Sequence, residues 1–184
     1  ANLALAWEYH TGEIPPPDTQ GSLIAFEDQP SLIEGNLVVC TPSRRLIALD
    51  PQTGDERWVY DPKARKTGMQ KCRGIVSWVD QQLPADASCK TRIFLGTADN
   101  RLVAIDAKNG KPCDGFGKQG AVQINPSKPE IFPGELLITS RPAVVNDVVV
   151  VGSAVADNQR VDAPSGRVLA FDARTGAQVW EFDP

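Results

Sequence analysis

Two neighbouring polar residues, Asp157 and Asn158, have the kind of side chains that a metal site would use. Carboxylate and amide oxygens suit a hard cation such as calcium or magnesium. A divalent ion held there could polarise a carbonyl group of a bound molecule as a Lewis acid. Asp-Asn is also a common turn signal, so a plain turn in a polar loop is the alternative interpretation.

A second candidate site is built from groups that bind anions. Arg73 follows a cysteine and begins an apolar strand, so we expect its guanidinium group to be directed inward. A cation there needs a carboxylate partner or an anionic ligand, and a structural ion pair would satisfy the same need. Thr139 and Ser140 begin an inner strand and could donate hydroxyl groups to a carboxylate, although such residues often serve only in turns.

The strands that position these loops come from an internal repeat. Its two clearest copies are 45–62 and 167–184, where eight of eighteen positions are identical, and a weaker copy begins at Arg101. Each copy has an apolar run followed by an Asp-x-x-Thr-Gly or Asp-x-x-Asn-Gly turn. The aspartate can accept backbone N–H bonds, and the glycine supplies a positive φ. Each copy therefore predicts a β-hairpin, and two of them carry a tryptophan on the second strand.

About four strands per unit, with a tryptophan on the outermost strand, predict an all-β fold made of β-propeller blades. The tryptophan would lie over the neighbouring blade. We expect a single partial propeller, with an outer strand of a preceding blade followed by three blades: 1–12, about 22–62, about 72–118 and about 135–184. Three blades and a spare strand cannot close a ring, so we expect the chain to be part of a longer protein.

Composition excludes several classes of function. The chain is 41% apolar and 23% charged, which is ordinary for a globular protein, and its net charge of −4 provides no positive surface for nucleic acid. No apolar run approaches the roughly 20 residues that span a membrane. The single histidine and the lack of a Cys-x-x-Cys pair argue against a zinc site.

Two of the four cysteines, Cys89 and Cys113, flank consecutive predicted strands. Adjacent strands of one sheet would bring them near each other, so we predict a disulfide between them. Such a bond would fit an oxidising compartment. The alternative is a pair of small buried thiols.

Together these features resemble a known family. The D-x-x-T-G-x-x-x-W repeat is similar to the tryptophan-docking motif of quinoprotein dehydrogenases, which bind pyrroloquinoline quinone (PQQ) on an eight-bladed propeller. Further stretches resemble the membrane-bound glucose dehydrogenase branch, with its quinate and polyol relatives, in their order and spacing. These stretches are Phe26–Pro30, Cys72–Ile75, Thr139–Pro142, Gly152–Asn158 and Pro164–Gly166.

The resemblance assigns roles to particular residues. It implies that PQQ is contacted by four side chains: Glu27, Arg73, Thr139 and Ser140. For Glu27, an acid exposed in a loop is the alternative. The family's metal ligands fall on Asp157 and Asn158, which implies calcium or magnesium. The catalytic residues of the family match no position in this chain, so we expect them beyond Pro184.

Three departures from the family pattern leave the substrate open. Met69 stands where glucose-oxidising members tend to carry a histidine that contacts the cofactor. Arg141 stands where a small residue or proline is more usual. Only Cys72 is present where the methanol dehydrogenase branch has two adjacent cysteines, which argues against that branch.

We therefore expect a periplasmic PQQ-dependent dehydrogenase of a sugar or polyol, either free or anchored to the inner membrane. It would pass electrons to a membrane quinone. This chain alone would be inactive, and it would self-associate through open blade edges at 3–9 or at the last strand. The alternative is a non-enzymatic propeller that acts as a protein-binding scaffold. Convergence of the predicted site residues around one cavity would favour the enzyme.

Overall fold

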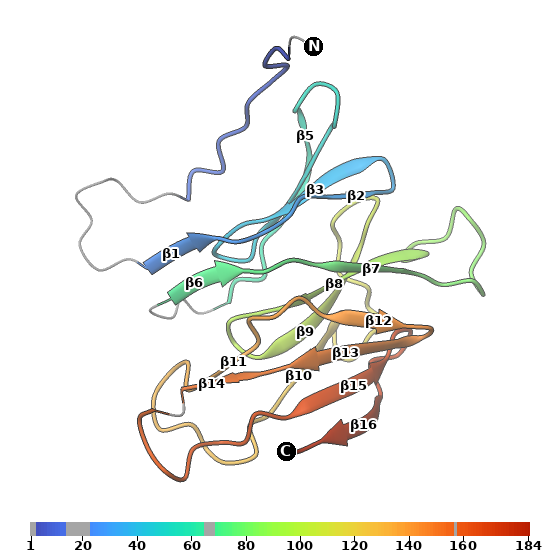
Figure 1. Cartoon of the computed structure of the whole chain (residues 1–184). Helices are drawn as coiled ribbons and strands as arrows, with labels where there is room; N and C mark the ends of the chain where they lie inside the picture. The colour runs from blue at the N-terminus through green and yellow to red at the C-terminus, as the bar shows by residue number, and fades with distance from the viewer. Residues whose placement is uncertain (1–2, 14–22, 65–68, 157) are drawn as a thin grey trace.

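A computed structural model describes residues 3–13, 23–64, 69–156 and 158–184 of the chain. Within these ranges the secondary structure is entirely β, with three four-stranded antiparallel sheets and two two-stranded sheets (Figure 1). The described residues contain no helix long and apolar enough to cross a membrane. The predicted all-β fold of blade-like sheets is confirmed.

Each four-stranded sheet is an antiparallel array of strands that follow one another in the chain. The first sheet comprises β2 (Ser31–Ile33), β3 (Asn36–Cys40), β4 (Leu46–Leu49) and β5 (Glu56–Tyr60). The second comprises β7 (Val76–Val79), β8 (Thr91–Gly96), β9 (Arg101–Asp106) and β10 (Ala121–Gln123). The third comprises β12 (Ala143–Val145), β13 (Val148–Gly152), β15 (Val168–Asp172) and β16 (Gln178–Phe182).

Two short sheets lie outside the blades. Strand β1 (Leu23–Phe26) pairs in parallel with β6 (Met69–Cys72), although 42 residues separate the two strands. Strand β11 (Leu136–Leu137) pairs in antiparallel with β14 (Ala154–Val155). Both pairs join segments that lead into or out of the blades, and the predicted site residues lie on these segments.

The hairpin turns form as the repeat predicts. Asp50 accepts hydrogen bonds at Oδ1 from the backbone N–H groups of Gln52 (2.7 Å) and Thr53 (3.1 Å). Gly54 closes the turn with φ of 78° and donates its N–H to the Asp50 carbonyl at 2.9 Å. The same contacts recur around Asp172 in the third sheet. The aspartate and the glycine therefore have structural roles in each repeat.

Two of the four tryptophans, Trp7 and Trp58, dock onto the turn glycines of the next unit. A Cβ atom added at Gly110 would lie 2.5 Å from the Trp58 ring, and one at Gly54 would lie 2.7 Å from the Trp7 ring. Both glycines are therefore required for close packing as well as for their positive φ. Trp7 docks in the same way, although residues 3–13 contain no strand.

The joint between the second and third sheets uses a different aromatic residue. Cys113 pairs with Ala104 through its backbone N–H at 2.9 Å, as a residue of an outer strand would, and forms a disulfide with Cys89. Phe116 follows in a loop and is fully buried, and its ring is 3.3 Å from a Cβ built at Gly176. The outer strand β10 forms only after this loop. Phe116 thus takes the place that tryptophan occupies in the other joints.

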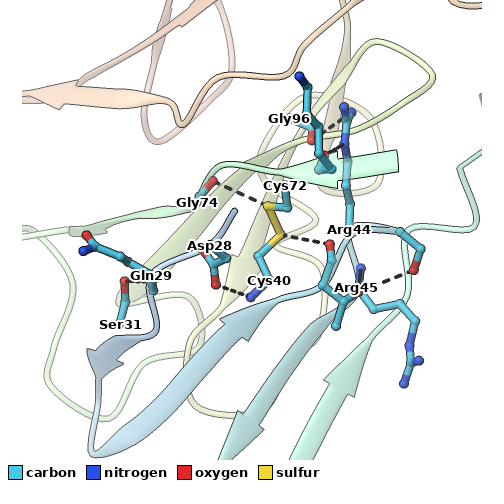
Figure 2. Close-up of a disulfide and its surroundings, with 12 residues drawn as sticks. Asp28, Gln29, Ser31, Cys40, Arg44, Arg45, Cys72, Gly74 and Gly96 are labelled. Atoms are coloured by element: carbon cyan, nitrogen blue, oxygen red, sulfur yellow. Dashed lines mark hydrogen bonds between the residues drawn. A yellow bond between two sulfur atoms is a disulfide. The ribbon is translucent and has the colours of Figure 1, made fainter. Parts of the chain in front are cut away.

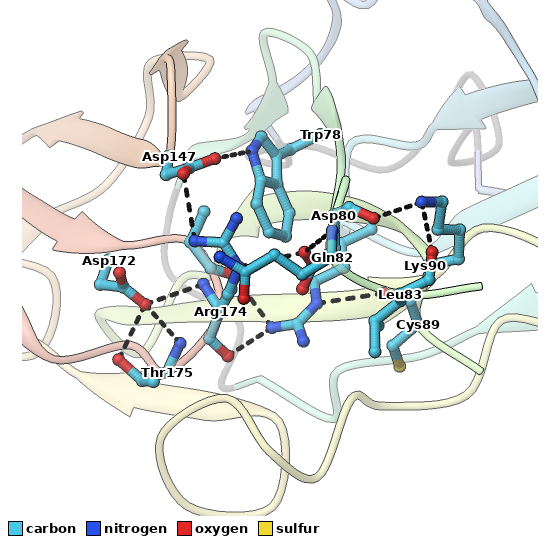
Figure 3. A network of polar contacts seen from close by, with 12 residues as sticks. Trp78, Asp80, Gln82, Leu83, Cys89, Lys90, Asp147, Asp172, Arg174 and Thr175 are labelled. Carbon is cyan, nitrogen blue, oxygen red and sulfur yellow. Dashed lines mark hydrogen bonds and ion pairs between the residues drawn. The ribbon is translucent and has the colours of Figure 1, made fainter. Parts of the chain in front are cut away.

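A polar cluster also connects the second and third sheets. We call it the joint cluster, and it comprises Trp78, Asp80, Arg92, Asp147 and Arg174. Figure 3 labels all of these residues except Arg92. The guanidinium groups of two arginines, Arg92 and Arg174, lie 5.6 and 5.0 Å from the Trp78 ring centre. This arrangement places two cations on one indole.

Candidate functional site

The candidate site forms where β1 and β6 end. Their parallel register places Phe26 opposite Cys72, so the next residues along each strand, Glu27 and Arg73, emerge side by side. The Arg73 Nε donates to Glu27 Oε2 at 2.8 Å, and this hydrogen bond holds the pKa of the Glu27 carboxyl below its usual value. Two predicted cofactor contacts from distant parts of the sequence therefore meet.

The Glu27–Arg73 pair remains open to solvent. The side chains are 36% and 45% exposed, respectively. The ion pair that was the alternative for Arg73 does form, but it uses only the Nε donor of the guanidinium. The remaining N–H groups of Arg73 have no protein partner among the described residues, so they are available to an anionic ligand.

A disulfide that the sequence did not predict joins Cys40 to Cys72, the residue just before Arg73 (Figure 2). Cys40, at the end of β3, is bonded to Cys72, with 6.0 Å between the Cα atoms. It ties the first blade to the residue just before Arg73. Together with the confirmed Cys89–Cys113 bond, it leaves no free cysteine in the protein. The only signal for it in the sequence was a second pair of cysteines near strand ends.

Asp28, next to Glu27, is anchored to the same disulfide. Its Oδ2 accepts the backbone N–H of Cys40 at 2.7 Å (Figure 2). Its Oδ1 is buried and has no hydrogen-bond partner in the part of the chain that the structure describes. Burial raises the pKa of the Asp28 carboxyl despite the opposing effects of the Cys40 hydrogen bond and the nearby charge of Arg141. Sequence reasoning missed this residue, because nothing in the pattern distinguishes it from an exposed acid in a loop.

Arg141 brings the third segment to the site. Gly74 has φ of 121°, and a Cβ built on it would lie 3.2 Å from Arg141 Cδ and 3.5 Å from Asp28 Oδ1. The Arg141 side chain therefore lies across Gly74, beside Asp28. Its neighbour Ser140 is exposed, whereas Thr139 is only 9% exposed. Neither hydroxyl has a side-chain hydrogen bond among the described residues.

The predicted metal ligands are only partly described. Asp157 lies outside the described residues, and Asn158 is exposed. Within the described ranges, no group of three or more His, Cys, Asp or Glu residues is arranged to hold a metal ion. The structure therefore neither assembles nor excludes a metal site at Asp157 and Asn158, and this assignment stays a prediction.

The segment that contains the predicted metal ligands is held at both ends by Glu135. The Glu135 carbonyl accepts the Ala156 N–H at 2.9 Å. Its fully buried carboxylate binds the Arg160 guanidinium through two hydrogen bonds of 2.6 and 3.1 Å. The Arg160 bonds hold the pKa of Glu135 below its usual range. Sequence reasoning did not identify this clamp.

A buried cation, Arg44, also lies near the disulfide (Figure 2). It is 3% exposed and has φ of 65°, a conformation that a large side chain rarely adopts. It donates to the Lys71 carbonyl at 3.2 Å and the Gly96 carbonyl at 3.4 Å, and burial lowers its pKa to about 10. Arg44 therefore links the first blade to β6 and β8.

Comparison with known proteins identifies similar sequences in one family of dehydrogenases. The family model for the β-propeller domain of PQQ glucose/ethanol/alcohol dehydrogenases matches residues 1–184. The glycerol dehydrogenase large subunit of Gluconobacter oxydans (strain 621H) is 36% identical over 98% of this chain and 25% of its own length. The quinate/shikimate dehydrogenase (quinone) of Acinetobacter baylyi (strain ATCC 33305 / BD413 / ADP1) is 30% identical over 100% of this chain and 24% of its own length.

Solved structures extend the likeness to the fold. The quinohemoprotein alcohol dehydrogenase of Comamonas testosteroni superimposes with a TM-score of 0.67 and 26% identity, over 89% of this chain and 22% of that one. The chain spans about a quarter of the length of the curated relatives it matches.

Proposed function

The chain belongs to the PQQ-dependent glucose/ethanol/alcohol dehydrogenase propeller family, and from this membership we propose that it forms part of an oxidoreductase of sugars or polyols. The observation that carries the proposal is the meeting of Glu27 with Arg73, beside the loop that contains Ser140. The segments come from three separate parts of the sequence, and the donors that an anionic ligand would use are the guanidinium N–H groups of Arg73 that Glu27 leaves free.

The residues present fit PQQ, which carries carboxylate groups and an ortho-quinone. Bound PQQ would supply the quinone that accepts a hydride from the substrate alcohol. Arg73 would bind acidic oxygens with the guanidinium donors that Glu27 leaves free, while Glu27 fixes the orientation of the group. The hydroxyls of Thr139 and Ser140 would add neutral donors. These assignments rest on the chemistry of the donors and on the family resemblance.

A divalent cation, calcium or magnesium, would bind at Asp157 and Asn158. The support for this proposal is that Glu135 holds the flanking residues Ala156 and Arg160 through hydrogen bonds. Because both ends of the segment are already fixed, binding an ion there would cost less conformational entropy. Calorimetric titration with calcium in the presence of PQQ tests it. Asn158→Ala should weaken calcium binding by about tenfold or more, whereas Gln159→Ala, at the neighbouring exposed position, should leave it unchanged.

Two disulfides support a periplasmic location, because such bonds persist in oxidising compartments. Electrons would leave for a membrane quinone. The catalytic base would lie outside these 184 residues, so the chain alone should be inactive. Oxidation of glucose, quinate or glycerol by the isolated chain, measured with a redox dye after adding PQQ and calcium, would show that this expectation is wrong.

Equilibrium dialysis of PQQ against the chain tests the proposed cofactor site. Arg73→Met should weaken PQQ binding by about tenfold or more, because a charge-assisted hydrogen bond is lost. Arg57→Met is the matched control, since Arg57 is similarly exposed and pairs with Asp50 in a hairpin turn. Equal binding by the two variants would contradict the proposal. No binding by the unmodified chain would favour the scaffold alternative.

A further inference from the structure

Arg141 lies at the candidate site, but the cofactor contacts proposed above do not include it. Among the ten arginines in the described ranges, the other nine donate at least one hydrogen bond to a protein oxygen. Arg141 donates none and has no ion pair within these ranges, and it is exposed. Its full set of donors therefore faces solvent at the edge of the candidate site.

The position of Arg141 is nevertheless well defined. Its aliphatic stem lies across Gly74, where a Cβ would come within 3.2 Å of its Cδ. Gly74 is itself buried and follows Arg73, which is paired with Glu27, and Cys72, which is held by the disulfide. The stem is thus packed against the most rigidly connected part of the site.

The carboxylate of Asp28 does not form an ion pair with Arg141. The charge of Arg141 acts on Asp28, but no oxygen of that carboxylate lies within ion-pair distance of the guanidinium. Asp28 Oδ2 is bound to the Cys40 N–H, and Oδ1 is buried. Asp28 therefore leaves the N–H groups of Arg141 without an ion-pair partner among the described residues.

We propose that Arg141 binds a carboxylate group of a small molecule held at this site, next to Arg73. A planar guanidinium with all its donors free matches a carboxylate through two parallel hydrogen bonds. This inference deepens the proposed function and rests on it for the location of the ligand. Two molecules would present a carboxylate there: PQQ itself, and a polyol substrate that is also an acid.

The test uses the chain labelled with ¹⁵N at arginine and follows the Nε–Hε resonance of Arg141 by NMR. The signal is assigned by its loss in Arg141→Met. Titration with quinate, with PQQ, and with the methyl ester of quinate separates the sources. We expect a saturable shift with at least one of the two acids and none with the ester, because the ester lacks the charge. A response to quinate identifies an acidic substrate, and a response to PQQ alone identifies the cofactor.

Variants supply the quantitative test. Arg141→Met should weaken binding of the responding acid by about tenfold, and Arg141→Lys should restore only part of it, because an ammonium lacks the planar fork. Arg57→Met is the control and should bind as the unmodified chain does. An Arg141 signal that moves with neither acid, or equally with quinate and its ester, would overturn the inference. Binding of quinate at Arg141 without any binding of PQQ would contradict the proposed cofactor site and leave this inference standing.

Discussion

Two clusters of arginines and carboxylates lie at opposite ends of strand β7, and they differ in how far their donors are used. In the joint cluster, Arg174 pairs with Asp80 at 3.0 Å and with Asp147 at 3.1 Å, and Trp78 also donates to Asp147 (Figure 3). In the candidate site, Arg73 has one partner, and Arg141 has none among the described residues. The same residue types therefore make a structural joint in one place and leave binding capacity in the other.

Burial follows the same division for part of the joint cluster, although its Asp147 side chain is 53% exposed. Asp80 and Trp78 in the joint cluster are 3% and 6% exposed. The Arg73 side chain is 45% exposed. A paired charge that is buried serves stability or specificity of the fold, whereas an exposed and partly paired charge costs little to keep and remains able to bind. The comparison shows that unused donors, more than the presence of arginine, distinguish the candidate site from the joint cluster.

Truncating the centre of the joint cluster should have the largest effect on stability. Trp78→Ala removes a buried indole from the core between the second and third sheets and should lower the free energy of unfolding by about 3–5 kcal/mol. Urea denaturation measures it. Trp180→Ala, at an indole that is 44% exposed, is the control and should cost about 1 kcal/mol or less. Equal losses would show that the joint cluster is not a stabilising centre.

Removing the disulfide beside the candidate site should have a smaller effect on stability but should also act on binding. Replacing Cys40 and Cys72 with serine opens a loop with a sequence separation of 32 and should cost about 3–4 kcal/mol at most. PQQ binding should weaken as well, because the anchors of Arg73 and Asp28 are lost. The matched removal of the Cys89–Cys113 bond should destabilise the chain without that loss of PQQ affinity. Similar PQQ affinities in the two variants would contradict the proposed connection between the Cys40–Cys72 disulfide and PQQ binding.

Two aspartates, one from each cluster, should respond to pH in opposite directions. The pKa of Asp28 is raised by burial, so its ionisation costs stability as pH rises through that pKa. Asp28→Asn should therefore stabilise the chain at pH 7, by about 1 kcal/mol or less, and this gain should vanish below the ordinary aspartate pKa of roughly 4.

Burial by itself would raise the pKa of Asp80, but the hydrogen bonds from Gln82 and Arg174, together with the charges of Arg174 and Arg92, lower it overall. Its contribution to stability is therefore present above the ordinary pKa and is lost as pH falls through the lowered one. Asp80→Asn should destabilise the chain at pH 7, with a difference that shrinks in acid. Urea midpoints of the two variants between pH 3 and pH 7 check both signs, and changes in the same direction would refute the contrast.

The smallest effect on stability should come from the outer strand β16. Val179 and Phe182 are 54% and 59% exposed, next to the half-exposed Trp180. Phe182→Lys should leave the unfolding free energy within about 0.5 kcal/mol and reduce self-association, which light scattering at high protein concentration measures. A monomeric chain before substitution would count against this predicted association.

The repeat made much of the fold predictable. The Asp and Gly positions of each copy anticipated the turns, and the tryptophans anticipated packing on the next unit, because both follow from local rules. The Cys89–Cys113 bond could also be predicted from the sequence, because its cysteines flank consecutive strands of one sheet. Glu27 and Arg73 were singled out through the family resemblance, and their ion pair depends on the parallel pairing of β1 with β6.

Other features depend on contacts that no local pattern encodes. Cys40 and Cys72 meet because a blade end and a connecting segment lie together. The burial of Arg44 and its positive φ run against the usual preferences of arginine. Arg174 lies against Trp78 although the two residues are far apart in the sequence. Only the packing of the second sheet against the third brings them together. The roles of these residues can be recognised only from the packed three-dimensional structure.

The docking of Trp7 and Trp58 on turn glycines of the following unit has a consequence for how such a chain can grow. Trp58 belongs to one copy of the repeat, and its receptor Gly110 belongs to the next. The first copy therefore carries the aromatic residue of one joint, Trp58, and the receptor glycine of another, Gly54. A gene duplication in frame that adds one whole copy creates matched joints on both sides, without any compensating mutation. Ring size could thus change by whole units during evolution, while a duplication of half a unit would leave an indole without its glycine.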